Sequence, residues 1–207
     1  MSWHVREGER HRRPTHRWLE PHLKIATTAA VCKTETVDGP ELDDGVIRLR
    51  CWADGDAAWY ADRVRDPAIQ RFTTDPPTLD AAQVLAAIIR LRDAKDAEGF
   101  VIVDAVTGTR LGNIAVKHDG RVGEVSYWLA AEARGRGTAT RALTLFTAWL
   151  FRIIGLAELR LHAHLDNTAS QRVALRAGYQ RDPHRDGPQE AKGVVWPMLA
   201  FRYLDEA

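Results

Sequence analysis

Residues 134–140 read Arg134-Gly135-Arg136-Gly137-Thr138-Ala139-Thr140, between a predicted strand and a predicted amphipathic helix. Gly135 and Gly137 allow a tight turn in which no Cβ atom keeps a ligand away from the backbone. Successive N–H groups then point into the loop, and the start of the helix adds a partial positive charge. This combination predicts a binding site for phosphate or pyrophosphate, to which Arg134 and Arg136 can add charge-assisted hydrogen bonds.

The segment matches neither of the two best-known phosphate-binding motifs. No Gly-Lys-Ser/Thr follows it, so it is not a P-loop. The strand before it ends a meander instead of opening a strand–helix–strand unit, so it is not a dinucleotide-binding fingerprint. By itself the segment also suits a glycine-rich helix start with solvated arginines, and its surroundings must decide between the two interpretations.

The surrounding elements are predicted from periodicity, with apolar residues alternating in strands and recurring every three or four positions in helices. The predicted strands cover residues 46–52, 99–104, 110–117, 123–129, 159–165 and 194–203, and a short one starts at 179. The predicted helices cover residues 54–64, 78–95, 138–153 and 167–177, the first two capped by Asp54 and Thr78. Prolines predict a stiff loop over 67–78, and polar residues predict a loop over 182–193.

Composition places the chain among globular proteins. Its 207 residues carry 29 Lys and Arg against 28 Asp and Glu, and a net charge of +1 gives no support to bulk binding of nucleic acid. No apolar run approaches the ~20 residues that cross a bilayer, and the first residues lack a signal-peptide pattern. The two cysteines, Cys32 and Cys51, suit a reducing compartment. We therefore expect a cytoplasmic protein without a membrane partner.

The first 43 residues differ from the rest of the chain. No helical or strand period holds there, and Pro14, Pro21 and Pro40 interrupt the stretch. We predict a weakly ordered N-terminal extension over residues 1–43 and one domain over residues 44–207. The functional alternative is a basic arm that docks RNA or the ribosome, because residues 1–24 carry six positive and three negative groups.

Four segments, taken in order, carry a resemblance to a known family. They are Glu124-Val125-Ser126-Tyr127-Trp128-Leu129, the loop 134–140, Asn167-Thr168-Ala169-Ser170-Gln171-Arg172-Val173, and Ala177-Gly178-Tyr179. Their order and spacing resemble the GNAT superfamily of acetyltransferases over about residues 44–207. The Arg-x-x-Gly-x-Ala pattern at 134–139 looks like the family's acetyl-CoA pyrophosphate loop. The Asn-x-x-Ser pattern followed by Ala-Gly-Tyr is most similar to the subgroup that acetylates the amino termini of ribosomal proteins.

This resemblance implies an α/β (α+β) fold, with a mixed central sheet of about six to seven strands flanked by about four helices. It implies that strands 123–129 and 158–165 splay apart and leave backbone groups for the pantetheine arm of acetyl-CoA. The N–H of Leu129 or of a neighbouring residue would then polarise the thioester carbonyl. The residues expected to bind acetyl-CoA are Leu129, Arg134, Gly135, Arg136, Gly137, Thr138, Ala139, Asn167 and Ser170.

Two polar side chains are candidates for proton transfer. Many relatives carry a tyrosine general acid at the position of Ala174, so Ser170 becomes the candidate that meets the departing thiolate. Glu124 is the candidate base, if partial burial on its strand raises its pKa, and a surface carboxylate paired with an arginine is the alternative. Asn167 can contact the cofactor arm or cap the helix that follows it.

Aromatic and histidine side chains complete the candidate site. Tyr127 and Trp128 are assigned to the acceptor side, with core packing as the alternative. His162 and His164 share a strand face with Asp166, but two alternating histidines without a third ligand nearby do not predict a metal site. We therefore expect no metal.

The predicted function is transfer of an acetyl group from acetyl-CoA to a primary amine, with a protein N-terminal α-amine as the expected acceptor and a monomer or homodimer as the assembly. A small-molecule acetyltransferase, acting on an antibiotic or a polyamine, is the alternative on the same scaffold. No acidic cluster favours a polycation, since the carboxylates of the 182–193 loop are offset by Arg181, Arg185 and Lys192. A non-catalytic acyl-CoA-binding or ribosome-associated protein is the alternative of a different class.

Overall fold

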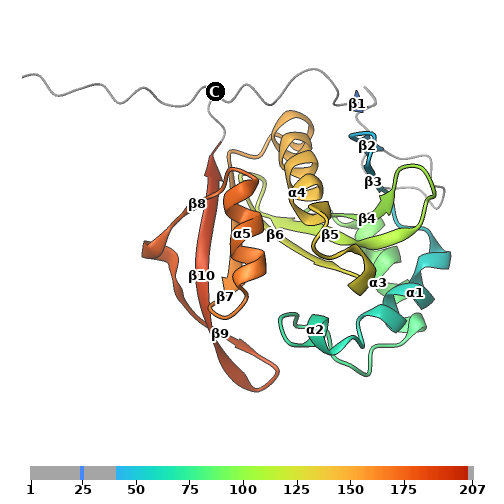
Figure 1. The fold of residues 1–207 in the computed structure, drawn as a ribbon, viewed down its shortest axis with the longest axis horizontal. Helices are drawn as coiled ribbons and strands as arrows, with labels where there is room; N and C mark the ends of the chain where they lie inside the picture. The colour runs from blue at the N-terminus through green and yellow to red at the C-terminus, as the bar shows by residue number, and fades with distance from the viewer. Residues whose placement is uncertain (1–23, 26–40, 205–207) are drawn as a thin grey trace, which may run out of the picture.

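The computed structural model describes residues 24–25 and 41–204. One mixed sheet runs through it in the order β1-β2-β3-β4-β5-β6-β7-β10-β8, and β9 pairs with β10 (Figure 1). The strands are β1 (Lys24–Ile25), β2 (Leu42–Asp43), β3 (Ile47–Arg50), β4 (Ala97–Asp104), β5 (Arg110–His118), β6 (Val122–Leu129), β7 (Glu158–His164), β8 (Gln180–Arg181), β9 (Gly187–Ala191) and β10 (Val194–Leu204). The α-helices are α1 (Ala57–Arg63), α2 (Pro67–Gln70), α3 (Ala81–Asp93), α4 (Thr138–Trp149) and α5 (Thr168–Arg176).

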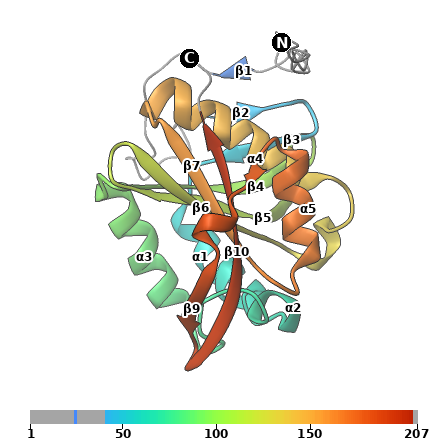
Figure 2. The same ribbon diagram turned by 90° about the vertical axis from the view of Figure 1, so that its left-hand side faces the viewer.

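The predicted mixed α/β fold is confirmed, and the sheet of the described residues is wider than expected. Strands β1 and β2 have two residues each, too few for a period of two to reveal them. The short strand expected from residue 179 is present as β8. The prediction of a loop over 182–193 is wrong for residues 187–191, which form β9 against β10. Backbone pairing needs no apolar pattern, and this hairpin extends beyond the rest of the sheet (Figure 2).

Alternation along β4 sends its side chains into two separate cores. Phe100 and Ile102 pack on the side of α4, in a core that includes Phe146. Val101 and Val103 face the opposite way and pack with residues of α1 and α3. The sheet therefore lies between α4 on one face and α1 and α3 on the other (Figures 1 and 2).

The splayed pair of strands is present at the centre of the sheet. Parallel pairing joins residues 122–124 of β6 to residues 158–160 of β7 and then stops. Beyond that point β6 continues along β5, whereas β7 continues along β10. The carboxyl ends of β6 and β7 are thus separated, and the backbone groups that face the gap are not used by the sheet.

The first two long helices begin later than predicted. Helix α3 starts after Asp80 and not at Thr78, because the Asp80 side chain accepts a hydrogen bond from the Gln83 N–H while Gln83 Oε1 accepts one from the Asp80 N–H. The predicted cap Asp54 lies in a 3-10 turn before α1. Its carboxylate instead pairs with Arg92 at 2.7 Å.

The proline-rich segment expected to be a loop contains helix α2. Asp66 accepts a hydrogen bond from the Ala68 N–H at 2.8 Å, and Pro67 occupies the first helical position, where a missing N–H costs nothing. The remainder of the stretch, through Thr78, has no regular helix. This short helix becomes important because it forms one wall of the site.

The N-terminal edge of the sheet brings one further correction. Cys51, just after β3, is buried and disulfide-bonded, so the expectation of a reduced cysteine is wrong there. Cys32 lies outside the described residues, as do residues 1–23 and 26–40. The predicted extension over residues 1–43 and its order therefore stay predictions.

Candidate active site

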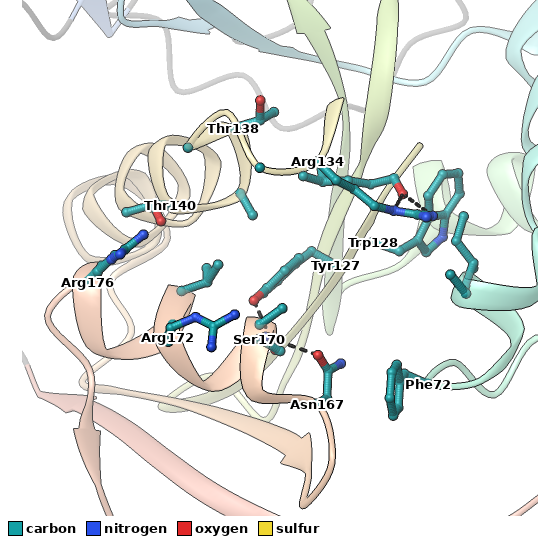
Figure 3. A pocket seen from close by; sticks show the side chains of 18 of the residues that line it. Phe72, Tyr127, Trp128, Arg134, Thr138, Thr140, Asn167, Ser170, Arg172 and Arg176 are labelled. Carbon is teal, nitrogen blue, oxygen red and sulfur yellow. Dashed lines mark hydrogen bonds between the residues drawn. The ribbon is translucent and has the colours of Figure 1, made fainter. Parts of the chain in front are cut away.

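A cavity of about 390 Å³ opens where β6 and β7 diverge, and residues of α2, α4 and α5 line it (Figure 3). Ten of the predicted site residues line this cavity: Tyr127, Trp128, Leu129, Arg134, Gly135, Gly137, Thr138, Ala139, Asn167 and Ser170. Thr140 and Arg176 lie at one end of the view in Figure 3 and Phe72 at the other, with Tyr127 and Ser170 between them. The exposed Arg136 and the carboxylate of Glu124 are not part of the lining.

The start of α4 forms one end of the cavity. Gly135 and Gly137 have left-handed φ values of 74° and 81°, which glycine adopts without strain. Gly137 is the N-cap residue and provides no side-chain hydrogen bond, so the first N–H groups of α4 keep their donor capacity. Thr138 and Ala139 belong to this first turn. The loop therefore offers backbone donors and the positive end of a helix dipole to an anion.

Arg134 is bonded to the protein itself. Its Nε and Nη2 donate to the carbonyl oxygen of Leu129 at 3.1 and 2.9 Å, and Nη2 also donates to Asp66 Oδ2 at 2.6 Å. Burial alone would raise the pKa of Asp66, but its hydrogen bonds with the Ala68 N–H and Arg134 lower it. Arg134 thus joins the glycine loop to the end of β6 and to the start of α2, a role that sequence reasoning missed.

The backbone of Leu129 faces the gap between the strands. Leu129 lies opposite Gly112 of β5. The Ala130 N–H donates to the Leu111 oxygen, so in this antiparallel ladder Leu129 and Gly112 do not bond to each other. In such a pair the N–H of Leu129 points away from β5, toward the side that β7 has left. That N–H can donate to a ligand in the cavity.

Helix α5 presents Ser170 from its first turn. Asn167 caps the helix by accepting a hydrogen bond from the Ser170 N–H at 3.1 Å, and it also lines the cavity. Ser170 Oγ lies 3.0 Å from the hydroxyl oxygen of Tyr127 (Figure 3). Burial raises the pKa of Tyr127 to about 12, although the hydrogen bond with Ser170 opposes the shift. Ala174, one turn further on, is fully buried.

Glu124 lies apart from this cavity. It belongs to the paired part of β6 and lines a separate hollow with Lys117 and Arg160. Its Oε1 is 3.0 Å from His162 Nδ1, and this hydrogen bond lowers the pKa of Glu124, so the expectation of a raised pKa is wrong. A carboxylate that lies outside the cavity and holds its proton weakly is poorly placed as the base, and we assign it no catalytic role.

Trp128 combines packing with a place in the cavity wall. Its side chain stacks on Trp59 with ring centroids 5.6 Å apart and meets Tyr60 edge-on at 5.1 Å. Phe72 forms the wall beyond α2, and its ring lies 5.6 Å from that of His164. Phe72 and Trp128 therefore bring aromatic rings to the end of the cavity away from α4.

Two groups of lining residues were missed by sequence reasoning. Arg172 and Arg176 of α5 line the end of the cavity near α4. The sequence does indicate that these two arginines share a helix face, because they are four residues apart on a predicted helix just after the Asn-x-x-Ser motif. The α2 segment contributes Ala68, Ile69, Phe72 and Thr73. Nothing local marks that segment, because only tertiary contacts bring it to the site.

Among the described residues, no group of three or more His, Cys, Asp or Glu side chains is arranged to hold a metal ion. His162 and His164 instead contact Glu124 and the Asp166 N–H, each at 3.0 Å. None of the helices in the described part of the chain is long and apolar enough to span a membrane. The cavity is thus the feature of these residues that best suits a ligand.

Comparison with known proteins places this geometry in a family. The sequence matches the acetyltransferase (GNAT) domain over residues 47–180, more than half of the chain. The chain therefore belongs to the GNAT family, and it is an acetyl-CoA-dependent N-acetyltransferase. No curated protein matches the sequence.

Several solved structures have the same fold. The ribosomal-protein-S5-alanine acetyltransferase of Vibrio fischeri superposes with a TM-score of 0.69 at 17% identity, over 80% of this chain and 97% of that chain. RimJ of Mycobacterium smegmatis, in complex with CoA-disulfide, superposes with a TM-score of 0.68 at 21% identity, over 78% of this chain and 83% of that chain. Spermidine N-acetyltransferase of Vibrio cholerae, in complex with CoA and spermine, superposes with a TM-score of 0.68 at 17% identity, over 76% of this chain and 95% of that chain. At these identities the likeness concerns the fold alone.

The cavity suits acetyl-CoA as a co-substrate. Free amides at the start of α4 match the diphosphate, and backbone groups that β6 and β7 do not use for pairing with each other match the amides of the pantetheine arm. Arg172 and Arg176 add positive charge at the end near α4. The reacting acetyl group would then lie near Leu129, Tyr127 and Ser170.

Proposed function

We propose that this protein transfers the acetyl group of acetyl-CoA to the α-amino group of a protein or peptide chain. The first turn of α4, with Gly135 and Gly137, holds the diphosphate in this proposal. The N–H of Leu129 donates to the thioester oxygen and stabilises the negative charge that develops there. Ser170 meets the sulfur as it leaves, while Tyr127 and Trp128 form the wall next to the acceptor.

The observation that carries the choice of acceptor is the chemistry of the lining. Of the described residues that line the cavity, none is Asp or Glu, and three are arginines. Without a carboxylate base, the amine has to lose its proton to water before it attacks. An α-amine with a pKa near 8 is about one-tenth neutral at pH 7, whereas a lysine amine with a pKa near 10.4 is neutral in about one molecule in 2,500. An α-amine is therefore the better acceptor.

The same lining disfavours a polyamine acceptor. Several ammonium groups on one molecule need carboxylates to replace their water, and the lining supplies none. Two acidic residues of the 182–193 segment are already paired, Asp186 with Arg181 at 2.7 Å and Asp182 with Arg185 at 3.3 Å, and the third, Glu190, does not line the cavity. An N-terminal amine carries a single charge and continues into a neutral peptide backbone, which suits the aromatic end of the cavity.

The test is a competition among matched acceptors. The full chain is incubated with acetyl-CoA and three amines: a lysine-free peptide with a free N-terminus, the same peptide N-terminally blocked and carrying one lysine, and spermidine. Mass spectrometry then identifies the molecule that gains one acetyl group. We expect the free N-terminus to be modified at least tenfold faster than the other two. Preferential acetylation of spermidine would contradict the proposed acceptor, and release of thiol with no acetylated amine would contradict the transferase function itself.

A further inference from the structure

Two hydroxyl groups face each other in the middle of the cavity. Tyr127 extends from β6 and Ser170 from α5, and their oxygens are 3.0 Å apart (Figure 3). Both residues line the cavity. The sequence assigns Tyr127 to the acceptor wall, and the contact of its hydroxyl with Ser170 suggests a further task.

The direction of this hydrogen bond decides what Ser170 can do. Each hydroxyl has one proton, and the bond between the two oxygens uses one of them. If Ser170 donates, its proton is committed to Tyr127 and cannot reach a ligand. If Tyr127 donates, Ser170 keeps its proton for a third group. A phenol is the stronger acid and an alkyl hydroxyl the better acceptor, so donation from Tyr127 is the favoured direction.

We propose that Tyr127 is a positioning residue, which donates its hydroxyl proton to Ser170 Oγ and thereby directs the proton of Ser170 at the thioester sulfur of acetyl-CoA. This inference rests on the proposed transferase function. It gives the departing sulfur a hydrogen-bond donor built from two elements, in a chain where Ala174 occupies the position at which many relatives carry a tyrosine general acid.

Further contacts hold this arrangement in place. The N–H of Ser170 donates to Asn167 Oδ1 at 3.1 Å, and this cap holds the backbone of the first turn of α5 in place beside Tyr127. Burial keeps the phenol protonated, with a pKa of about 12, throughout the pH range in which an α-amine becomes neutral. The donor of the pair is therefore present whenever the acceptor amine can react.

The proposed step is balanced without any change in Tyr127 or Ser170. The lone pair of the neutral amine forms the new C–N bond, and the C–S bond breaks with its electron pair moving to sulfur. The hydrogen bond from Ser170 stabilises that charge. The proton that the amine gives up, carried by water, finally neutralises the thiolate, so the products are the amide and free coenzyme A.

The first test compares two buried tyrosines. Tyr127→Phe should lower kcat about tenfold, the loss expected for a hydrogen bond in a charged transition state, and leave the Kd for coenzyme A within about twofold. Tyr179→Phe is the matched control, because Tyr179 forms a hydrogen bond of 2.9 Å with the Thr147 hydroxyl in the core away from the cavity. It should lower the thermal stability but keep kcat within about twofold. Equal kcat for wild type and Tyr127→Phe would overturn the proposal.

A double-mutant cycle separates action through Ser170 from a general effect on the cavity. Ser170→Ala and the double variant with Tyr127→Phe should have the same kcat, because Tyr127 has nothing left to direct. Additive losses would overturn the proposal. Any amine that the wild-type protein acetylates can be used, so a wrong acceptor leaves this result intact, whereas a protein that acetylates no amine fails the proposed function before the cycle begins.

If Tyr127→Phe does not fold, a fluorinated tyrosine at position 127 keeps the hydroxyl and the shape. Its phenol ionises at lower pH, so kcat should fall as the pH rises through that ionisation. The wild-type protein should show no such fall over the same range. A fluorinated protein with the wild-type pH profile would contradict the proposed direction of the hydrogen bond.

Discussion

Gly137 and Gly155 flank the helical segment that begins with α4, and they allow backbone strain to be separated from ligand binding. Both have a φ of 81°, and a Cβ added at either would meet no atom within 4 Å. Alanine at either position should cost roughly 1–2 kcal/mol of unfolding free energy, because an L-residue is strained there. Gly137, however, orients the amides that face the cavity, whereas Gly155 lies beyond the far end of α4.

We therefore expect Gly137→Ala to weaken coenzyme A binding by at least tenfold, while Gly155→Ala leaves the affinity within about twofold. Isothermal titration calorimetry measures the affinities, and chemical denaturation measures the stabilities. Similar stability losses with divergent affinities would support a diphosphate at the start of α4. An unchanged affinity in Gly137→Ala would place the diphosphate elsewhere.

The ion pair of Asp66 with Arg134 links the start of α2 to the glycine loop. Asp66→Asn isolates this link, since asparagine keeps an oxygen for the Ala68 N–H but loses the charge that attracts Arg134. Because α2 lines the end of the cavity proposed for the acceptor, we expect the KM for the acceptor to rise several-fold with little change in the Kd for coenzyme A. Steady-state kinetics and calorimetry measure the two quantities.

Asp44→Asn is the matched control for Asp66→Asn. Asp44 likewise accepts backbone N–H bonds in a turn, from Val46 and Ile47, and pairs with Arg141 at 2.7 Å. This pair does not line the cavity. An equal rise in KM for the two variants would mean that α2 needs no link to Arg134.

The elements that sequence could predict are those fixed by local signals. The central meander follows from alternation and from the Asp-Gly turn at 119–120, and α5 follows from Asn167 and the Ala-Gly-Tyr that ends it. Helix α2 and strand β9 escaped prediction because packing and pairing with distant segments fix them. The 138–153 helix was predicted as uniform, but α4 ends at Trp149 and a π turn follows through Ile154.

The same distinction applies within the candidate site. The glycine loop and Ser170 could be placed from motif order, since short connections carry them to the strand ends. The sequence places Glu124 on the same strand face as Trp128. Four residues span roughly 13 Å along a strand, so a side chain on that face can still lie outside the cavity. The hydroxyl pair of Tyr127 and Ser170 joins residues 43 positions apart, so no local pattern reveals it.

For the whole molecule, buried Asp56 ties the first helical layer to the sheet. Its carboxylate accepts hydrogen bonds from Arg50 of β3 at 2.7 and 2.9 Å, from Arg110 of β5 at 2.6 Å and from the Ala53 N–H at 2.9 Å. Burial alone would raise the pKa of Asp56, but these hydrogen bonds outweigh it and lower the pKa. Asp56→Asn leaves the arginines without a counter-charge and should cost about 3–5 kcal/mol of unfolding free energy, measured by urea denaturation at pH 7.

The lowered pKa of Asp56 also fixes the sign of the acid response. A carboxyl whose pKa is lower in the folded than in the unfolded state stabilises the fold above its unfolded pKa, near 3.9, and loses that contribution as the pH falls through its folded pKa. Asp186, with a pKa of about 2 owing to Arg181, acts in the same direction. We therefore expect the unfolding free energy to decrease from about pH 4 toward pH 2, less steeply in Asp56→Asn. Asp62→Asn, an exposed control, should keep the wild-type slope, and a slope that Asp56→Asn leaves unchanged would show that other groups cause the acid response.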